Sequence, residues 1–224
     1  MPLKRLLFSL LLLCVSHCTG CVIAQFTNPL STSNDTAIDE RLVGHWEPVE
    51  INKKGVQTPV DSDTVFEQYI VMGRHSEKEN TIIAAQTKLS ADGTVAHESR
   101  VGKATILDNE SYISWELQPE ERGSPERPTL TNTAYTITQY TLQNKDKLLT
   151  IFMLDHEHII EAVKEGRLAG VIQEEVKTQK GKGKTEIKSV VIESTTAELR
   201  EYFTKFGSVA FNRSEPSYYR KVVK

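Results

Sequence analysis

Cysteine is nearly absent from this 224-residue chain, and the few cysteines lie at one end. Cys14, Cys18 and Cys21 all fall within the first 21 residues, and no cysteine follows. If residues 1–20 are removed during export, a single cysteine remains, at the new N-terminus. The rest of the chain therefore lacks the residues for an intrachain disulfide, a cysteine nucleophile or a thiolate metal site.

Long apolar runs and an excess of positive charge are also missing. No stretch after residue 25 approaches the roughly 20 apolar residues that a membrane-spanning helix requires. The chain has 27 Lys and Arg against 30 Asp and Glu, which gives a formal charge of −3. A mildly acidic chain has no overall attraction to nucleic acid, so no nucleic-acid partner is expected. The hydrophobic content of 38% is typical of a globular domain.

Residues 1–20 have the pattern of an export signal. Lys4 and Arg5 supply a positively charged start, and an apolar run follows over residues 6–15. That run is too short for a transmembrane helix, and its length and position are typical of a signal peptide. The chain is therefore expected to leave the cytoplasm.

The end of this segment carries a second pattern, Cys18-Thr19-Gly20-Cys21, which resembles the bacterial lipobox. In that family a small residue precedes a cysteine that receives a diacylglyceryl thioether before cleavage. Gly20 and Cys21 match the pattern, whereas Cys18 departs from it because the family usually has an aliphatic residue there. The resemblance implies lipidation at Cys21 and a membrane anchor of more than one acyl chain, which gives stable attachment without a spanning helix.

The residues after Cys21 bear on the final location. The family's inner-membrane retention signal is typically Asp at the next position, and Val22 stands there instead. The resemblance thus implies the outer membrane in a cell that has one, and otherwise the cell membrane. The alternative is ordinary cleavage after Ala24, which would release a soluble secreted protein that starts at Gln25.

The predicted organisation has three parts: a signal peptide over residues 1–20, the lipid-attachment site with a flexible tether over 21–40, and one β domain over 41–224. The tether is predicted because residues 25–39 are polar and lack apolar periodicity.

The β domain is predicted from short runs rich in Val, Ile, Thr and aromatic residues, which are typical of antiparallel strands. Polar turns are expected at residues 91–93 and 144–146, and a loop at the proline-rich residues 118–130. The expected strands lie near residues 42–51, 64–72, 80–89, 94–100, 103–107, 111–117, 133–142, 147–154, 168–176, 186–193 and 217–223.

Two helices are expected among the later strands. The first runs over residues 156–165, with Asp155 as its N-terminal cap and Gly166 at its end. The second runs over residues 196–206, because Thr195-Thr196-Ala197-Glu198 is a capping box that precedes an apolar stripe.

Gly44-His45-Trp46 places a Gly-x-Trp motif in the first expected strand of the domain, and here the sequence resembles the lipocalin or calycin group of barrels. The resemblance implies that Gly44 allows a tight start and that Trp46 closes the barrel floor. In that family a basic residue late in the chain packs over this tryptophan, and Arg220 is the candidate here. Its contact would be structural. The family's Thr-Asp turn motif is not evident. The expected fold class is mainly β, an antiparallel lipocalin-like barrel with two short helices.

Asp155-His156-Glu157-His158 gathers the most ligand-type residues in the chain. On a helix, residues two apart point in different directions, so His156 and His158 are not placed to chelate one ion as an i, i+4 pair would. The cluster instead fits a helix start with acidic residues near the positive end of the helix dipole. The sequence shows no known catalytic motif, and no enzyme activity, metal or cofactor is expected.

Residues 177–184, Lys-Thr-Gln-Lys-Gly-Lys-Gly-Lys, form a second unusual segment. They are interpreted as a solvated loop between two strands, with contact to anionic lipid headgroups near the anchor as the alternative.

The predicted function is that of an exported, lipid-anchored, noncatalytic binding module of the cell envelope. Any ligand would be small and apolar and would lie inside the barrel near Trp46. A protein-interaction or assembly factor with a filled barrel is the alternative, and a hydrolase is the third hypothesis. A buried cavity above about 300 Å³ would favour the first role, and a packed interior with an exposed apolar patch the second.

Overall fold

The computed structural model describes residues 24–32, 38–52, 55–59, 69–76, 80–89, 95–117, 133–179 and 182–222. Within these ranges lie the helices α1 (His156–Lys164) and α2 (Thr196–Phe206). The strands are β1 (Ala24–Phe26), β2 (Gly44–Ile51), β3 (Gln57–Pro59), β4 (Tyr69–Arg74), β5 (Ile82–Leu89), β6 (Val95–Leu107), β7 (Glu110–Glu116), β8 (Tyr135–Gln143), β9 (Leu148–Phe152), β10 (Gly170–Gln179), β11 (Lys182–Ile192) and β12 (Ser217–Lys221).

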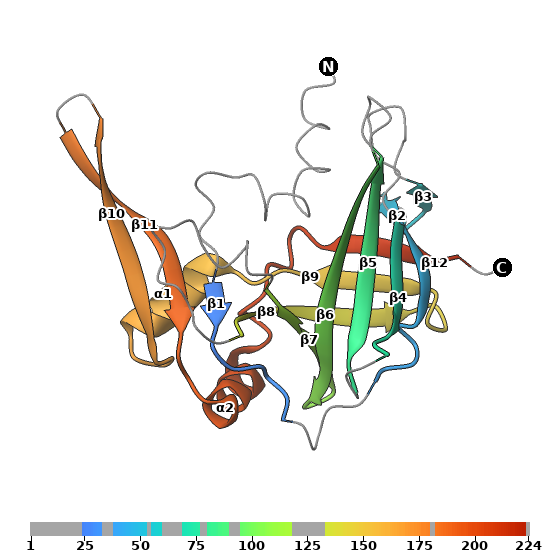
Figure 1. Ribbon diagram of the computed structural model, residues 1–224, viewed down its shortest axis with the longest axis horizontal. Helices are drawn as coiled ribbons and strands as arrows, with labels where there is room; N and C mark the ends of the chain where they lie inside the picture. The colour runs from blue at the N-terminus through green and yellow to red at the C-terminus, as the bar shows by residue number, and fades with distance from the viewer. Residues whose placement is uncertain are drawn as a thin grey trace.

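Eight of these strands close into a barrel (Figure 1). Strands β2 and β4 to β9 pair in chain order, and β12 completes the ring by pairing with both β9 and β2. Every pairing in the ring is antiparallel. The expected fold class, a mainly β, antiparallel lipocalin-like barrel with two short helices, is confirmed.

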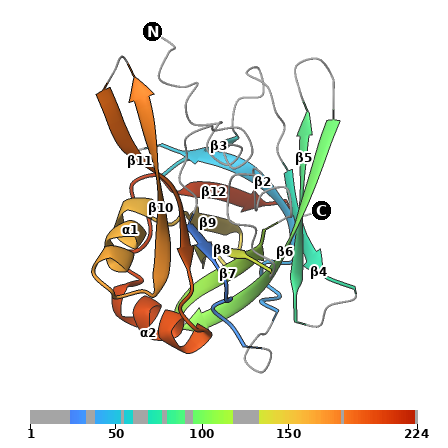
Figure 2. The same ribbon diagram turned by 60° about the vertical axis from the view of Figure 1, so that its left-hand side comes forward.

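The sheet continues outward from the barrel wall. β1 pairs with the start of β8 and, in parallel, with the end of β11, while β10 and β11 form a long hairpin. Helices α1 and α2 pack beside this extension (Figure 2). The described residues thus form a barrel and an attached layer of three strands and two helices, which is joined to the barrel at β8.

Each of the two parts has its own hydrophobic core. Side chains alternate between the two faces of β7 and β8, so one face of these strands lines the barrel interior and the other faces the helices. The core inside the barrel contains Leu42, Trp46, Ile70, Met72, Ile82, Ile113, Trp115, Tyr140, Leu149, Ile151 and Tyr219. The core between the barrel wall and the helices contains, among others, Phe26, Tyr112, Ile137, Ile159, Leu199, Phe203 and Phe211. The two cores meet across one layer of strands.

Both helices begin as predicted. The Asp155 carboxylate accepts a hydrogen bond from the backbone N–H of His158 at 3.1 Å. At α2 the Thr195 hydroxyl and the Glu198 carboxylate complete the reciprocal bonds of a capping box. The predicted turn at residues 144–146 is also present, and all three residues have positive φ, a conformation that Asn and Asp tolerate better than most residues.

The predicted flexible tether over 21–40 is wrong for part of its length. Ala24, Gln25 and Phe26 are buried in β1, and Leu30 lies in the outer core. A strand of three residues is too short to leave a period in the sequence, so its burial depends on the β8 and β11 residues that receive it. Residues 1–23, including the predicted signal peptide and Cys21, lie outside the described residues.

Two further expectations need correction. The strands expected at 94–100 and 103–107 are one strand, β6, in which Gly102 lies opposite Trp115. A Cβ at Gly102 would stand 2.7 Å from the indole ring, so glycine allows this close approach. Most of the loop expected at 177–184 belongs to strands β10 and β11. The predicted turn at 91–93 and loop at 118–130 lie outside the described residues.

Candidate ligand-binding site

One end of the barrel is closed by Trp46. Its side chain is fully buried, and the indole N–H donates to the backbone carbonyl of Leu42 at 2.8 Å. The Nζ of Lys221 lies 5.2 Å from the centroid of the Trp46 ring and donates to the backbone carbonyl of Arg41 at 2.9 Å. One lysine therefore connects the tryptophan to the segment that crosses the barrel end.

The expectation that Arg220 packs over Trp46 is wrong by one residue. In the β2–β12 pairing Lys221 is the partner of Trp46, and Arg220 is the partner of Glu47. Successive strand residues point to opposite faces, so Arg220 lies on the outer face, where its guanidinium pairs with the Glu47 carboxylate.

Gly44 is the first residue of β2. It adopts φ of +145°, a value that side chains disfavour. A Cβ at this position would also meet the Cε of Lys221 at 2.7 Å. Gly44 therefore makes room for the lysine that covers Trp46.

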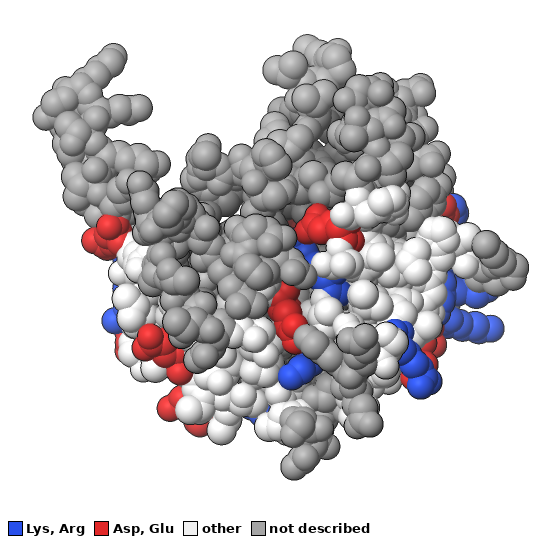
Figure 3. All heavy atoms as spheres, viewed as in Figure 1, with Lys and Arg blue, Asp and Glu red and all other residues white. Residues whose placement is uncertain are grey.

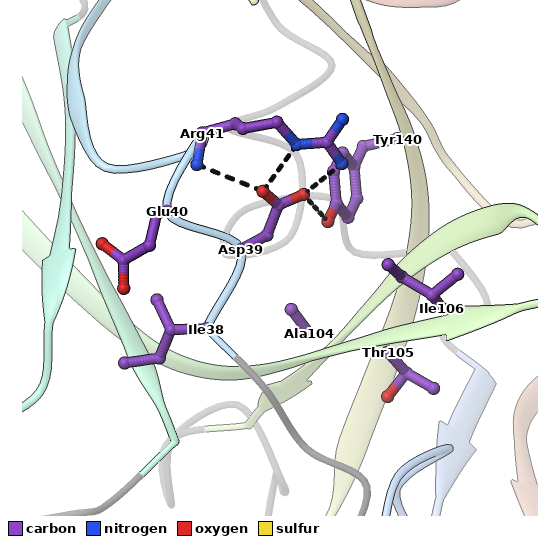
Figure 4. A pocket seen from close by; sticks show the side chains of 8 residues that line it. All are labelled: Ile38, Asp39, Glu40, Arg41, Ala104, Thr105, Ile106 and Tyr140. Atoms are coloured by element: carbon purple, nitrogen blue, oxygen red, sulfur yellow. Dashed lines mark hydrogen bonds and ion pairs between the residues drawn. The ribbon is translucent and has the colours of Figure 1, made fainter.

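Outside this closed end lies a groove of about 410 Å³ between the segment 38–41 and strands β6 and β8 (Figure 4). The Asp39 carboxylate accepts hydrogen bonds from Arg41 at 2.8 Å and from the Tyr140 hydroxyl at 2.7 Å. Burial raises the pKa of Asp39, but these hydrogen bonds outweigh it and hold the pKa below its ordinary value. The same environment, burial first, raises the pKa of Tyr140. Asp39, Arg41 and Tyr140 are thus paired with one another, whereas the hydroxyl of Thr105, which also lines the groove, is buried without a hydrogen-bond partner among the described residues.

The barrel interior holds a second cavity, of about 140 Å³. It is bounded by strands β4 to β9 and by the start of α1. Its apolar lining consists of Ile70, Met72, Ala84, Trp115, Leu117, Ile151 and Met153, and its polar lining consists of Gln86, Glu98, Arg100, Thr136, Thr138 and His156. Trp46 is not among these described lining residues, although its β4 partner Ile70 is.

Among the described residues that line this cavity, Glu98 and Arg100 form an ion pair. The guanidinium of Arg100 donates to the Glu98 carboxylate at 2.8 and 3.1 Å. The two residues are two apart on β6, so both side chains point inward, as do their β5 partners Ala84 and Gln86. Their side chains keep 21% and 35% of their exposure, so the pair is only partly removed from solvent.

Two more polar side chains line the cavity, Trp115 and His156, and they differ in whether their ring nitrogen has a hydrogen-bond partner. The Trp115 indole N–H donates to the Thr138 hydroxyl at 2.9 Å, which orients that ring along the cavity wall. The Nδ1 of His156, by contrast, is buried without a hydrogen-bond partner among the described residues. Burial lowers the pKa of His156, which the nearby Asp155 offsets only in part, so the imidazole is neutral at neutral pH.

The Asp155-to-His158 cluster does not converge. Asp155 caps the helix, His156 lines the cavity, and His158 packs against Tyr202 with ring centroids 6.3 Å apart. No group of three or more potential metal ligands occurs among the described residues.

Charge on the surface is mixed. Acidic and basic side chains both occur on the face drawn in Figure 3, and the described residues there form no extended area of one sign. No helix among those described is long and apolar enough to cross a membrane.

Comparisons of the chain with family models, curated proteins and solved structures found no match. The barrel geometry and the N-terminal sequence are therefore the features that bear on function.

Sequence reasoning missed Arg100 and Lys221 as interior residues. Either could have been found only from the strand register, because a shift of one residue moves a side chain to the opposite face. Glu98 and Arg100 lie two apart in an expected strand, which indicates that their side chains share one face. The sequence does not say whether that face points into the barrel.

Proposed function

We propose that this protein is an exported, noncatalytic binding barrel, anchored to the membrane by acylated Cys21, that holds one small amphipathic ligand beside Arg100. The observation that carries the proposal is the interior cavity, in which a largely apolar wall surrounds an ion pair. Apolar concave sites with a few polar groups select and orient small molecules.

The cavity revises the expected ligand in two ways. Its volume of about 140 Å³ is below the 300 Å³ taken as the threshold for a ligand barrel, so the enclosed part of the ligand is small. A dry cavity of about 150 Å³ accepts a benzene ring, which sets the scale. The Arg100–Glu98 pair adds polar groups to the wall, so a small amphipathic group fits better than a wholly apolar one.

The matching experiment uses benzoate and benzyl alcohol as probes, titrated into unacylated Cys21→Ser protein by calorimetry. Benzoate is expected to bind, and Arg100→Met is expected to weaken benzoate about tenfold or more while changing benzyl alcohol little. Arg74→Met is the control, because that side chain is exposed and 65% accessible. Ala84→Phe fills the cavity and should abolish binding of both probes.

Binding of neither probe by the unsubstituted protein would overturn the ligand proposal. The role of a protein-interaction or assembly factor would then be preferred, because the Trp46 end is already filled by side chains and Val171 and Val209 are exposed on the outer layer.

The anchor is tested separately, by the intact mass of the mature protein from its native host. A chain that starts at Cys21 and carries acyl chains, with both features lost in Cys21→Ser, is the expected result. A chain that starts at Gln25 without acyl chains would make the protein soluble and secreted.

A further inference from the structure

The polar lining of the interior cavity comes from two stretches of the barrel wall. The first group lies on the paired strands β5 and β6 and consists of Gln86, Glu98 and Arg100. The second group lies on β8 and at the start of α1 and consists of Thr136, Thr138 and His156. Strand β7 stands between β6 and β8 and adds the indole ring of Trp115 to the wall. The cavity therefore has one side with an ion pair and another side whose polar groups carry no formal charge at neutral pH.

The chain on both sides of His156 holds this residue at the cavity wall. Leu154 forms a β-bridge with Phe211, and the backbone N–H of Asp155 donates to the carbonyl of Ala210 at 2.9 Å. The Asp155 carboxylate caps the helix that begins at His156. The backbone of His156 is therefore fixed before a ligand arrives, which lowers the cost of ordering this contact on binding.

The Nδ1 atom of His156 is buried and has no hydrogen-bond partner among the described residues. Most buried polar atoms in proteins have a partner, because an atom without one loses its hydration and gains nothing in return. Among the described residues that line the cavity, no other side-chain atom is in this condition. A ligand that reaches His156 would therefore restore a missing hydrogen bond.

The chemistry of this side of the cavity suits an uncharged hydroxyl group. Burial lowers the pKa of His156, so the ring is neutral and its Nδ1 holds either a proton or a lone pair. A hydroxyl both donates and accepts, and so it pairs with Nδ1 in either form, whereas a carboxylate only accepts and an ammonium only donates. Thr138 lies on the same side, and its hydroxyl oxygen already accepts from the Trp115 indole N–H.

We propose that His156 is a specificity-determining residue of the interior cavity and that its Nδ1 binds a hydroxyl group of the ligand. The inference rests on the proposed function, because it assigns a second polar contact in the same cavity. It narrows the ligand class to a small, largely apolar alcohol or phenol. The apolar wall would take the body of such a molecule, and His156 would orient its hydroxyl end.

Calorimetric titration of the unacylated Cys21→Ser protein with benzyl alcohol and ethylbenzene tests this contact, because the two probes differ by a hydroxyl in place of a methyl group. His156→Phe keeps an aromatic ring and removes both nitrogens. It should weaken binding of benzyl alcohol, measured relative to ethylbenzene, about tenfold. His156→Asn returns a hydrogen-bonding group to the side chain and should recover part of that loss.

His158→Phe is the matched control, because it makes the same substitution two residues along the helix. The His158 ring packs against Tyr202, with ring centroids 6.3 Å apart, and His158 is not among the described residues that line the cavity. The affinity of His158→Phe for benzyl alcohol relative to ethylbenzene should equal that of the parent. Circular dichroism of each variant confirms that the fold is retained.

NMR spectra of the imidazole nitrogens add a measurement that a merely structural role would not move and that needs no substitution at His156. The Nδ1 resonance of His156 should shift more with benzyl alcohol than with ethylbenzene, and the resonances of His158 should stay in place. Equal shifts with the two probes would overturn the proposal even if His156→Phe failed to fold.

Two binding results would also overturn it: an unchanged relative affinity in His156→Phe, or an equal loss in His156→Phe and His158→Phe. If benzoate still binds in an Arg100-dependent manner in either case, the binding barrel stands and the hydroxyl contact alone is refuted. If neither benzoate nor benzyl alcohol binds the unsubstituted cavity, the proposed function fails and this contact fails with it.

Discussion

Lys221 and Trp46 are cross-strand partners, and the lysine ammonium lies over the indole ring with its Nζ 5.2 Å from the ring centroid. The same ammonium donates to the backbone carbonyl of Arg41, so one side chain joins three parts of the barrel end: β12, β2 and the crossing segment before Gly44. A cation so placed gains from the ring quadrupole as well as from its hydrogen bond.

Lys221→Met should lower the free energy of unfolding by about 1 kcal/mol or more, since it keeps the packing but removes the charge and the hydrogen bond. Arg220→Met is the matched variant, and it should cost less than about 1 kcal/mol because its pair with Glu47 is on the outer face. Urea denaturation of both measures the difference. A larger loss for Arg220→Met would contradict the assignment.

Trp46→Ala should reduce the free energy of unfolding by about 3–5 kcal/mol, because the ring is fully buried and its loss leaves a cavity. Ile106→Ala is the control, since Ile106 is 61% exposed and its loss should cost about 0.5 kcal/mol or less. Chemical denaturation measures both. A loss below about 1 kcal/mol for Trp46→Ala would remove this residue from the core of the barrel.

Thr195→Ala should destabilise the protein by about 1 kcal/mol, because it removes one half of the α2 capping box. Thr204→Ala, at an exposed position in the same helix, should be neutral or slightly stabilising because alanine favours helix. Thermal unfolding of both variants compares them. Equal melting temperatures would show that the cap contributes nothing.

Acid stability should depend on Asp39. Its pKa is lowered in the folded protein, so its contribution is complete above the unfolded pKa of 3.8 and is lost as the pH falls through the lower folded value. Asp39→Asn should therefore flatten the decline of unfolding free energy below about pH 4. An unchanged slope in Asp39→Asn would show that the carboxylate is not stabilised by folding.

Much of the architecture followed from local pattern. The capping box at Thr195, the Asp155 cap, the turn at 144–146 and most strands depend on residues close together in the chain, and these were predicted correctly. The Gly-x-Trp motif also led to the correct fold class. Gly44 and Trp46 lie two residues apart in β2, and Lys221 lies beside both of them.

Other features depend on which residues meet across strands. β1 could not be predicted from three residues, since its burial comes from β8 and β11, which lie more than a hundred positions away in the chain. That 94–100 and 103–107 belong to one strand is seen only in the structure, where Gly102 lies against the Trp115 ring.

The sequence by itself determined that no cysteine follows Cys21 and that strands and two capped helices form where they do. The tertiary structure alone decided that Lys221 and not Arg220 covers Trp46, that Arg100 and Glu98 face the interior, and that His156 lines the interior cavity. The physical reason is that composition and caps act within a few residues, whereas register sets the face of every strand residue and a shift of one position reverses it.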